Sequence, residues 1–186
     1  MIIGIDEVGR GAWAGPLVVA AVGLGGESID GLTDSKLLSK KKRQTLSAEI
    51  KQRAPLIGIG WVSAHDIDTI GLSAALKLAS ERSVAQLDLS DIAQIIVDGT
   101  LRLIDDPRVV TMKKADLFVP SVSAASIIAK VARDRYMALC DQVFEGYGLQ
   151  SHVGYGAAAH RRAIENLGPT PLHRLSFEPM KSLFYH

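Results

Sequence analysis

The first 24 residues place two apolar runs on either side of a glycine-rich segment, and this arrangement limits what the chain can fold into. Residues 1–6 and 17–24 have the apolar, β-branched composition of buried strands. Residues 9–16 are rich in glycine and end in a proline, as turns do. The first run also delivers two adjacent carboxylates, Asp6 and Glu7, to the start of that turn.

One interpretation of this segment is a dinucleotide-binding turn, because residues 9–14 fit the loose pattern Gly-x-Gly-x-x-Ala. That fold requires a helix after the turn, with its N-terminal amides facing the pyrophosphate. Residues 17–24 instead read as a strand, so the chain turns back as a hairpin. Asp6 and Glu7 would also face the anion, and two like charges ~4 Å apart repel by about 4 kcal/mol at an effective dielectric constant near 20. The pattern therefore favours a hairpin.

The rest of the chain predicts strands that alternate with helices, which favours a mixed α/β sheet flanked by helices. Further short apolar runs predict strands over residues 56–62, 95–97 and 109–112. Apolar residues at helical spacing predict helices over residues 39–53, 73–87, 121–143 and 157–166. Ser39 is the expected N-cap of the first helix. No repeat or linker is evident, so we expect a single domain over residues 1–186.

Composition narrows the class of protein but says little about its partner. Apolar residues make up 47% of the 186 residues and charged residues 22%, as in a globular domain with a buried core. The single cysteine, Cys140, excludes an intrachain disulfide and a thiolate zinc cluster and fits a reducing compartment. The most apolar window, residues 12–24, is too short for a membrane span. We therefore expect a cytoplasmic protein with no membrane association, and the net charge of +1 indicates no particular partner.

Acidic residues recur where predicted strands end. Asp6 and Asp98 each follow an apolar run, and Asp116 comes four residues after another. If these strands are neighbours, the carboxylates converge, and such a cluster needs protons or hard cations. Oxygen ligands favour Mg²⁺ or Mn²⁺, and pairs of such ions commonly serve phosphoryl chemistry. Glu7 should point to the opposite face from Asp6 unless the strand has already begun to turn.

At this point the sequence resembles ribonuclease HII, the type 2 ribonuclease H, over nearly its whole length. The motifs that carry the resemblance are Gly4–Gly11 (GIDEVGRG), Asp34-Ser35-Lys36, Val97-Asp98-Gly99, Lys114-Ala115-Asp116, Ser123–Val131, Gly154-Tyr155-Gly156 and His173–Phe177. The first motif and the serine-alanine helix motif are specific, whereas Asp-Ser-Lys or Asp-Gly alone would be weak.

The resemblance implies an RNase H-like fold, with a central mixed β-sheet, flanking helices and a C-terminal helical segment. It implies metal-dependent cleavage of the RNA strand of RNA–DNA hybrids and of duplex DNA 5′ of single embedded ribonucleotides. The products would be a 3′-hydroxyl and a 5′-phosphate, and the role would be ribonucleotide removal in DNA repair and replication. Carried over by position, the catalytic and metal-binding residues are Asp6, Glu7, Asp98 and Asp116, with two Mg²⁺ or Mn²⁺ ions. A monomer is expected.

The resemblance also implies substrate contacts. The turn residues Gly9, Arg10 and Gly11 would present backbone groups to the 2′-hydroxyl, which distinguishes RNA from DNA. The ring of Tyr155 would pack on the sugar after the ribonucleotide. The expected phosphate contacts are Lys36, Ser123, Ser126, Lys130 and Arg133. His173 and Arg174 are read as possible structural residues. Val153 stands where the family usually has a lysine, which would remove a phosphate contact.

Two rival functions remain open on the sequence alone. Another RNase H-like metal nuclease that acts on DNA junctions would use the same strand-end carboxylates. A catalytically silent module that binds RNA–DNA hybrids would share the substrate contacts. A ribonuclease HII should cut a duplex 5′ of one embedded ribonucleotide and should not cut the all-DNA duplex, which distinguishes it from a junction nuclease. An enzyme should lose turnover in the Asp6→Asn variant but still bind, whereas a pure binding module should show no metal-dependent cleavage in either form.

Overall fold

The structure is a computed structural model that describes residues 1–184, and within them a five-stranded mixed sheet forms the centre. Its strands are β1 (Ile2–Val8), β2 (Leu17–Gly23), β3 (Leu56–Val62), β4 (Gln94–Asp98) and β5 (Val109–Met112). The order across the sheet is β3-β2-β1-β4-β5. Strand β2 is antiparallel to β1 and β3, whereas β1, β4 and β5 are parallel. The predicted mixed sheet is confirmed.

Strand β1 is longer than predicted. It continues past Asp6 and Glu7 to Val8, with Asp6 opposite Ala20 and Glu7 opposite Val19 of β2. The turn that would bring both carboxylates to one face therefore does not occur at Glu7. Successive residues of a strand point to opposite faces, so Asp6 and Glu7 approach the sheet edge from different sides.

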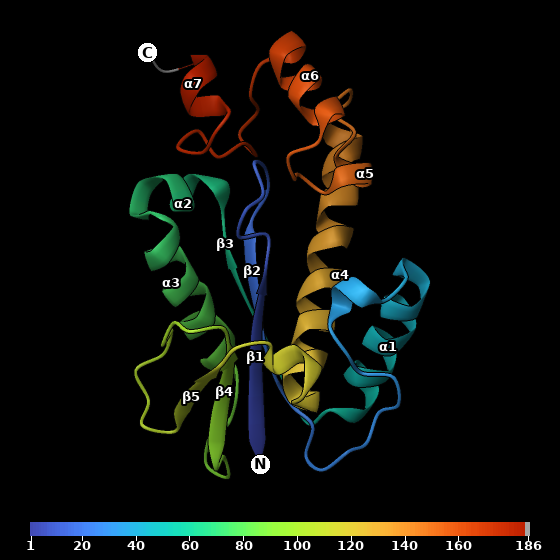
Figure 1. Ribbon diagram of the computed structural model, residues 1–186, viewed down its shortest axis with the longest axis vertical. Helices are drawn as coiled ribbons and strands as arrows, with labels where there is room; N and C mark the ends of the chain where they lie inside the picture. Colours follow the sequence, from blue (N-terminus) through green and yellow to red (C-terminus); the bar gives the residue numbers. More distant parts are fainter. Residues whose placement is uncertain (185–186) are drawn as a thin grey trace.

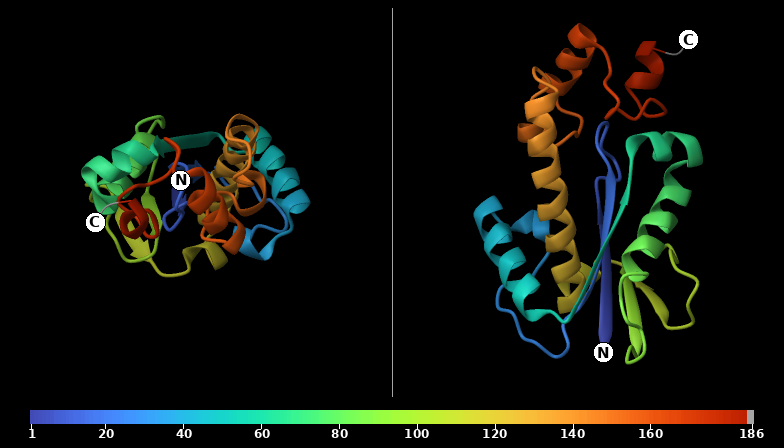
Figure 2. Two further views of the ribbon diagram at one scale, coloured as in Figure 1. Left: turned by 90° about the horizontal axis from the view of Figure 1, so that it is seen from above. Right: turned by 180° about the vertical axis from the view of Figure 1, so that it is seen from behind.

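Helices cover both faces of the sheet (Figures 1 and 2). Helices α1 (Lys40–Arg53) and α4 (Pro120–Val143) lie on one face, and α2 (Ala64–Ile70) and α3 (Leu72–Val84) lie on the other. Two short 3-10 helices, η1 (Ser35–Leu37) and η2 (Ala115–Leu117), come before α1 and α4. The three long helices match the predicted ranges to within a few residues, whereas α2 was not predicted.

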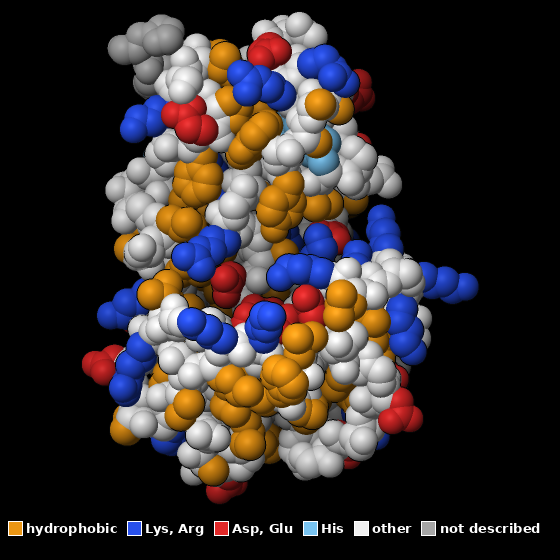
Figure 3. Space-filling model, in the orientation of Figure 1, with side chains coloured by type: hydrophobic (Ala, Val, Ile, Leu, Met, Phe, Trp, Pro, Cys, Tyr) orange, Lys and Arg blue, Asp and Glu red, His pale blue; other side chains and the backbone are white. Residues whose placement is uncertain are grey.

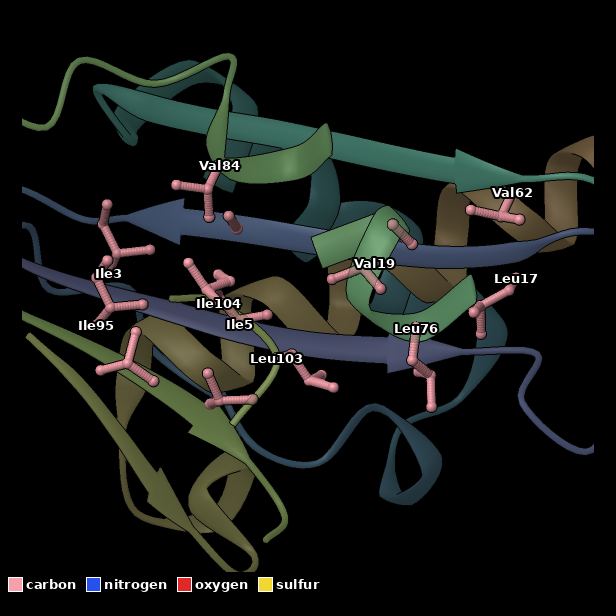
Figure 4. Close-up of a cluster of buried hydrophobic side chains, with 14 of the residues drawn as sticks. Ile3, Ile5, Leu17, Val19, Val62, Leu76, Val84, Ile95, Leu103 and Ile104 are labelled. Carbon is pink, nitrogen blue, oxygen red and sulfur yellow. The ribbon is translucent and has the colours of Figure 1, made fainter. Parts of the chain in front are cut away.

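Separate apolar cores fix the two helical layers to the sheet. On the α3 side, alternate residues of β1 and β2 such as Ile3, Ile5 and Val19 pack against Leu76 and Val84 (Figure 4). On the α4 side, the intervening residues of β2 pack against alanines and isoleucines of α4. Strand β2 is therefore buried along its whole length, which its unbroken apolar sequence requires.

The C-terminal part forms a third layer beyond the end of the sheet, at the top of Figure 1. It contains the short helices α5 (Leu149–His152) and α7 (Met180–Phe184) and, between them, α6 (Ala158–Leu167). Their apolar side chains pack on the second half of α4 and on Ala14 of the β1–β2 turn. The predicted C-terminal helical segment is confirmed, and it closes over the glycine-rich turn.

Local capping explains where helices begin. The Ser39 hydroxyl accepts a hydrogen bond from the Lys42 amide at 3.2 Å, as predicted for the first turn of α1. Ser63 caps α2 in the same way through the Asp66 amide at 3.0 Å. Among the helices of residues 1–184, none combines the length and the apolar character needed to cross a membrane.

Candidate active site

The strand register brings two of the predicted acids together. Strands β1 and β4 are parallel, with Ile5 opposite Val97, so Asp6 and Asp98 occupy the next positions at the same carboxyl edge. Ligand sites of open α/β sheets lie at this edge. Asp98 ends β4, and its Oδ1 accepts a hydrogen bond from the Ala115 amide at 2.8 Å. That contact ties Asp98 to η2, which contains Asp116.

Asp6 is the most perturbed of the four acids. Its side chain is buried, and burial, the negative charge of Glu7 and, more weakly, that of Asp98 raise its pKa to about 8. Hydrogen bonds from the Ser126 hydroxyl and from the Glu7 amide, the latter 2.8 Å from Oδ1, oppose that rise. A carboxyl held this way is protonated at neutral pH unless a cation replaces the proton.

Glu7 belongs to the same electrostatic cluster although it leaves β1 on the other side. Burial and the charge of Asp98 raise its pKa, while Arg10 lowers it. The Arg10 guanidinium lies 3.8 Å from Glu7 Oε1. Asp98 therefore acts on both Asp6 and Glu7 and links the two sides of the strand end.

Asp116 completes the group from η2, and it has a neighbour that sequence reasoning did not include. Burial and the negative charges of Asp34 and Asp98 raise the pKa of Asp116, while Lys36 lowers it. Asp34 caps η1 by accepting from the Lys36 amide at 2.9 Å. Asp34 is part of the Asp-Ser-Lys motif identified in the sequence, but only Lys36 of that motif was predicted to be a site residue.

Lys36 is the cation that these acids share. Burial lowers its pKa, but the charges of Asp34, Asp6, Asp116 and Asp98 outweigh that effect, so the net pKa is raised. Lys36 therefore lies within electrostatic reach of all four predicted catalytic acids, since its charge also lowers the pKa of Glu7. In Figure 3, acidic side chains gather in the middle of the face and basic side chains surround them.

The donor set fits hard divalent cations. Within residues 1–184, no three Asp, Glu, His or Cys side chains converge closely enough, as they stand, to enclose a metal ion. The pKa values of Asp6, Glu7 and Asp116 are nevertheless raised, in each case partly by the charge of Asp98, which means that these ionised carboxylates are destabilised by a neighbour. Bound cations relieve that repulsion, and an oxygen-only set without cysteine or histidine suits Mg²⁺ or Mn²⁺.

A polar hollow of about 290 Å³ opens beside the acids. Glu7, Arg10 and Asp98 line it together with Gly99 and Thr100. Three larger hollows, of about 470, 440 and 320 Å³, lie elsewhere: one between α1 and α4, one against Trp61 and Tyr136, and one beside Met1 and Pro120. Only the smallest of these four contains predicted catalytic residues.

The glycine-rich turn and Tyr155 meet at the edge of the site. The Gly9 amide donates to the Tyr155 hydroxyl at 3.1 Å. Gly9 has a φ of +86°, and a Cβ there would collide with the Arg133 side chain and lie 2.8 Å from the Pro16 carbonyl oxygen. A Cβ on Gly11 would meet open space. The turn thus packs on the protein at Gly9 and is open at Gly11.

Two of the predicted phosphate contacts, Ser123 and Arg133, already donate hydrogen bonds to the protein backbone. Arg133 is fully buried and donates to the carbonyls of Ala14, Pro16 and Val153 at 2.8–2.9 Å. The Ser123 hydroxyl is buried and donates to the Asp116 carbonyl at 2.7 Å. Their polar atoms are therefore unavailable to a phosphate, because the backbone already uses them.

Ser126 and Lys130 differ in how accessible they are. The buried Ser126 hydroxyl donates to Asp6, and it lies 2.9 Å from the Ser35 hydroxyl, from which it can accept. The half-buried Lys130 ammonium lies 2.8 Å from an Asp134 oxygen and 6.0 Å from the centre of the Tyr155 ring. Of the predicted phosphate contacts, Lys36 and Lys130 are those with a solvent-accessible cation beside the site.

Comparison with known proteins identifies the family. The sequence profile of ribonuclease HII matches residues 3–180. Ribonuclease HII of Halorhodospira halophila (strain DSM 244 / SL1) is 45% identical over 186 residues, which cover 98% of this chain and 94% of that protein.

Solved structures show the same fold. In the PCNA:RNase HII complex from Archaeoglobus fulgidus, the similar chain has a TM-score of 0.79 at 28% identity, with 96% of this chain and 95% of that one covered. Bst-RNase HIII, solved in complex with Mn²⁺, shares the fold with a TM-score of 0.72 at 23% identity, covering 97% of this chain and 68% of that one. With an RNase H-like fold, strand-end acids and a profile match over almost all its length, the chain belongs to the ribonuclease HII family of nucleases.

Proposed function

We propose that this protein cleaves the RNA strand of RNA–DNA hybrids and nicks duplex DNA 5′ of single ribonucleotides, leaving a 3′-hydroxyl and a 5′-phosphate. The observation that carries the proposal is that Asp98 ends β4 beside Asp6 of β1 and acts electrostatically on Asp6, Glu7 and Asp116. In a member of the ribonuclease HII family, such a cluster is the expected hydrolytic centre.

The four acids would hold two divalent cations, Mg²⁺ or Mn²⁺. Bound cations of this kind lower the pKa of an attacking water and stabilise negative charge on the leaving 3′ oxygen. Asp98 is suited to lie between the two sides of the site because it interacts with both Asp6 and Glu7. The Ala115 amide holds one Asp98 oxygen in place.

Ribonucleotide recognition would come from the turn and Tyr155. Backbone groups of Gly9, Arg10 and Gly11 would meet the 2′-hydroxyl, since Gly11 has no side chain and faces open space. The Tyr155 ring would contact the following sugar while its hydroxyl accepts from the Gly9 amide. Lys36 and Lys130 would contact phosphates without reading the sequence.

The decisive substrate is a DNA duplex that contains one ribonucleotide. With Mg²⁺, we expect a single cut on the 5′ side of that ribonucleotide and no cut in the all-DNA duplex. Cleavage of the all-DNA duplex would instead favour a junction nuclease. The Asp6→Asn variant should still bind the duplex but lose turnover, and full turnover in that variant would remove Asp6 from the centre.

A further inference from the structure

Three histidines that are distant in the sequence meet around the backbone that carries Tyr155. His160 and His173 are buried, with 0% and 2% exposure, and their Nε2 atoms lie 3.1 Å apart. The ring of His152 stacks on the ring of His160 with centres 4.2 Å apart. None of these side chains belongs to the acid cluster, and the proposed chemistry does not use them.

The protons on this histidine pair have a single arrangement that satisfies every contact. The His173 Nδ1 atom receives the Thr170 amide at 2.9 Å, so it carries no proton and the proton is on Nε2. The His160 Nδ1 atom lies 2.9 Å from the Tyr155 carbonyl oxygen, which only accepts, so Nδ1 carries the proton and Nε2 is bare. His173 Nε2–H therefore donates to His160 Nε2.

Burial keeps both rings in this neutral arrangement. It lowers the pKa of His160 and of His173 to about 4. A proton added to either ring would set two N–H donors against each other, at the paired Nε2 atoms or at the Thr170 amide. The chain of hydrogen bonds therefore runs in one direction, from Thr170 through His173 and His160 to Tyr155.

Tyr155 is held at both ends by hydrogen bonds, and the Arg133 guanidinium lies over its ring, 5.3 Å from the ring centre. Its amide donates to the His152 carbonyl at 2.9 Å, its carbonyl accepts from His160, and its hydroxyl accepts from Gly9. The preceding Gly154 carbonyl accepts from the amides of both Trp13 and Ala14 of the turn. The ring is thus held from its backbone end by histidine and from its hydroxyl end by the glycine-rich turn.

We propose that His160, held by His173, is a positioning residue that fixes Tyr155 against the Gly9 amide and so sets the preference for RNA–DNA junctions. The proposal rests on the proposed function of Tyr155 in reading the ribonucleotide. It makes substrate choice depend on the C-terminal segment, because Thr170 and His173 belong to that segment. Neither histidine touches the substrate.

The test compares variants that remove or retain the hydrogen bond between residue 160 and the Tyr155 carbonyl. His160→Phe keeps an aromatic ring but removes both hydrogen bonds. His160→Asn keeps an amide N–H near the position of Nδ1 and should retain the bond to the Tyr155 carbonyl. Tyr147→Phe is the matched control, since it removes a partly buried hydrogen bond to the Gly168 carbonyl but keeps the ring that packs on His173 and leaves every hydrogen bond of Tyr155 and His160 in place.

The first readout does not require activity. Hydrogen exchange at the Gly9 amide reports whether the Tyr155 hydroxyl still accepts from it. We expect the Gly9 amide to exchange about tenfold faster in His160→Phe, because that factor corresponds to the net loss of one hydrogen bond. We expect little change in His160→Asn or Tyr147→Phe. Unchanged Gly9 exchange in His160→Phe, or the same acceleration in Tyr147→Phe, would overturn the positioning role.

The second readout is the ratio of kcat/KM on a single-ribonucleotide duplex to kcat/KM on a long hybrid. His160→Phe should lower this ratio about fivefold to tenfold and should have no further effect in a Tyr155→Ala background. A loss that persists in that background would show that His160 does not act through Tyr155. If Gly9 exchange rises but Tyr155→Ala leaves the ratio unchanged, the positioning inference stands and the recognition role of Tyr155 fails instead.

Discussion

The Asp6→Asn substitution tests the acid cluster without measuring catalysis. The pKa of Asp6 is raised from 3.8 to about 8 by burial and by Glu7, so the folded protein binds a proton that the unfolded chain releases. A raised carboxyl pKa gives stability that is complete below pH ~4 and is lost as the pH rises towards about 8. In metal-free protein, the Asp6 carboxyl group therefore destabilises the fold at neutral pH. The neutral amide of Asn in the Asp6→Asn variant removes this destabilisation.

The magnitude follows from the shift. At pH 7.5, the pH lies well above the ordinary Asp6 pKa of 3.8. At 1.36 kcal/mol per pKa unit, this difference gives an upper limit of about 5 kcal/mol for the destabilisation of the folded state by Asp6. Side-chain relaxation and water entry reduce this figure, so we expect the free energy of unfolding to rise by about 2 kcal/mol in Asp6→Asn. For a chain of this size, that corresponds to an increase in Tm of roughly 4–8 °C.

The assay is thermal unfolding in a chelator at pH 5.5 and 7.5, followed by addition of Mg²⁺. The Tm advantage of Asp6→Asn should be larger at pH 7.5 than at pH 5.5. Mg²⁺ at ten times its Kd should stabilise the parent protein by about 1.4 kcal/mol and the variant much less. Asp30→Asn, a change at an exposed acid, serves as the control. A lower Tm in metal-free Asp6→Asn at pH 7.5, or equal stabilisation of parent and variant by Mg²⁺, would refute the reasoning.

Three further predictions concern the residues that hold the site. Val153 is β-branched with a φ of +44°, so Val153→Asn should raise the free energy of unfolding by about 1 kcal/mol in urea titrations; a decrease would show that the backbone there is unstrained. Arg133→Met should lower the free energy of unfolding by about 3 kcal/mol or more in the same titration, because it leaves three backbone carbonyls without their hydrogen-bond donor. A decrease of less than about 1 kcal/mol would contradict this role. His160 and His173 have pKa values lowered to about 4 from 6.5, so the unfolded chain binds more protons between these values and stability falls as the pH drops from 6.5 towards 4. Relative to the parent, a His160→Phe/His173→Phe variant should lose less stability between pH 7 and pH 5, and an equal loss would indicate that neither histidine is held neutral.

The sheet and the long helices could be predicted because their signals are local. Apolar runs fixed the strands, and the Ser39 cap and the spacing of apolar residues fixed α1 and α4. The short helix α2 escaped prediction because its seven residues carry too little periodicity, although Ser63 caps it as Ser39 caps α1. The position of Asp6 and Asp98 at the ends of predicted strands correctly indicated that they lie together. The sequence did not predict that β1 continues through Glu7.

Side chains whose partners lie far along the chain could not be assigned in the same way. The family resemblance predicted a phosphate contact for Arg133. The structure buries it because the turn and the residues around Val153 close over its side of α4. The histidine pair has no sequence signal at all, since thirteen positions separate its members and the bond between them depends on tertiary packing.

The glycine-rich turn beside the acids has few hydrogen bonds of its own, and two buried arginines supply what it lacks. Arg133, from α4, donates to the carbonyls of Ala14 and Pro16, and Arg174, from the C-terminal segment, donates to those of Arg10 and Gly15. Burial lowers the pKa of both guanidinium groups, and that of Arg174 falls only to about 10, so Arg174 remains charged at neutral pH. A buried cation is tolerable here because carbonyl dipoles solvate it. The turn therefore takes its shape only when β1, α4 and the C-terminal segment are packed together, so ribonucleotide recognition should be lost before the sheet itself unfolds.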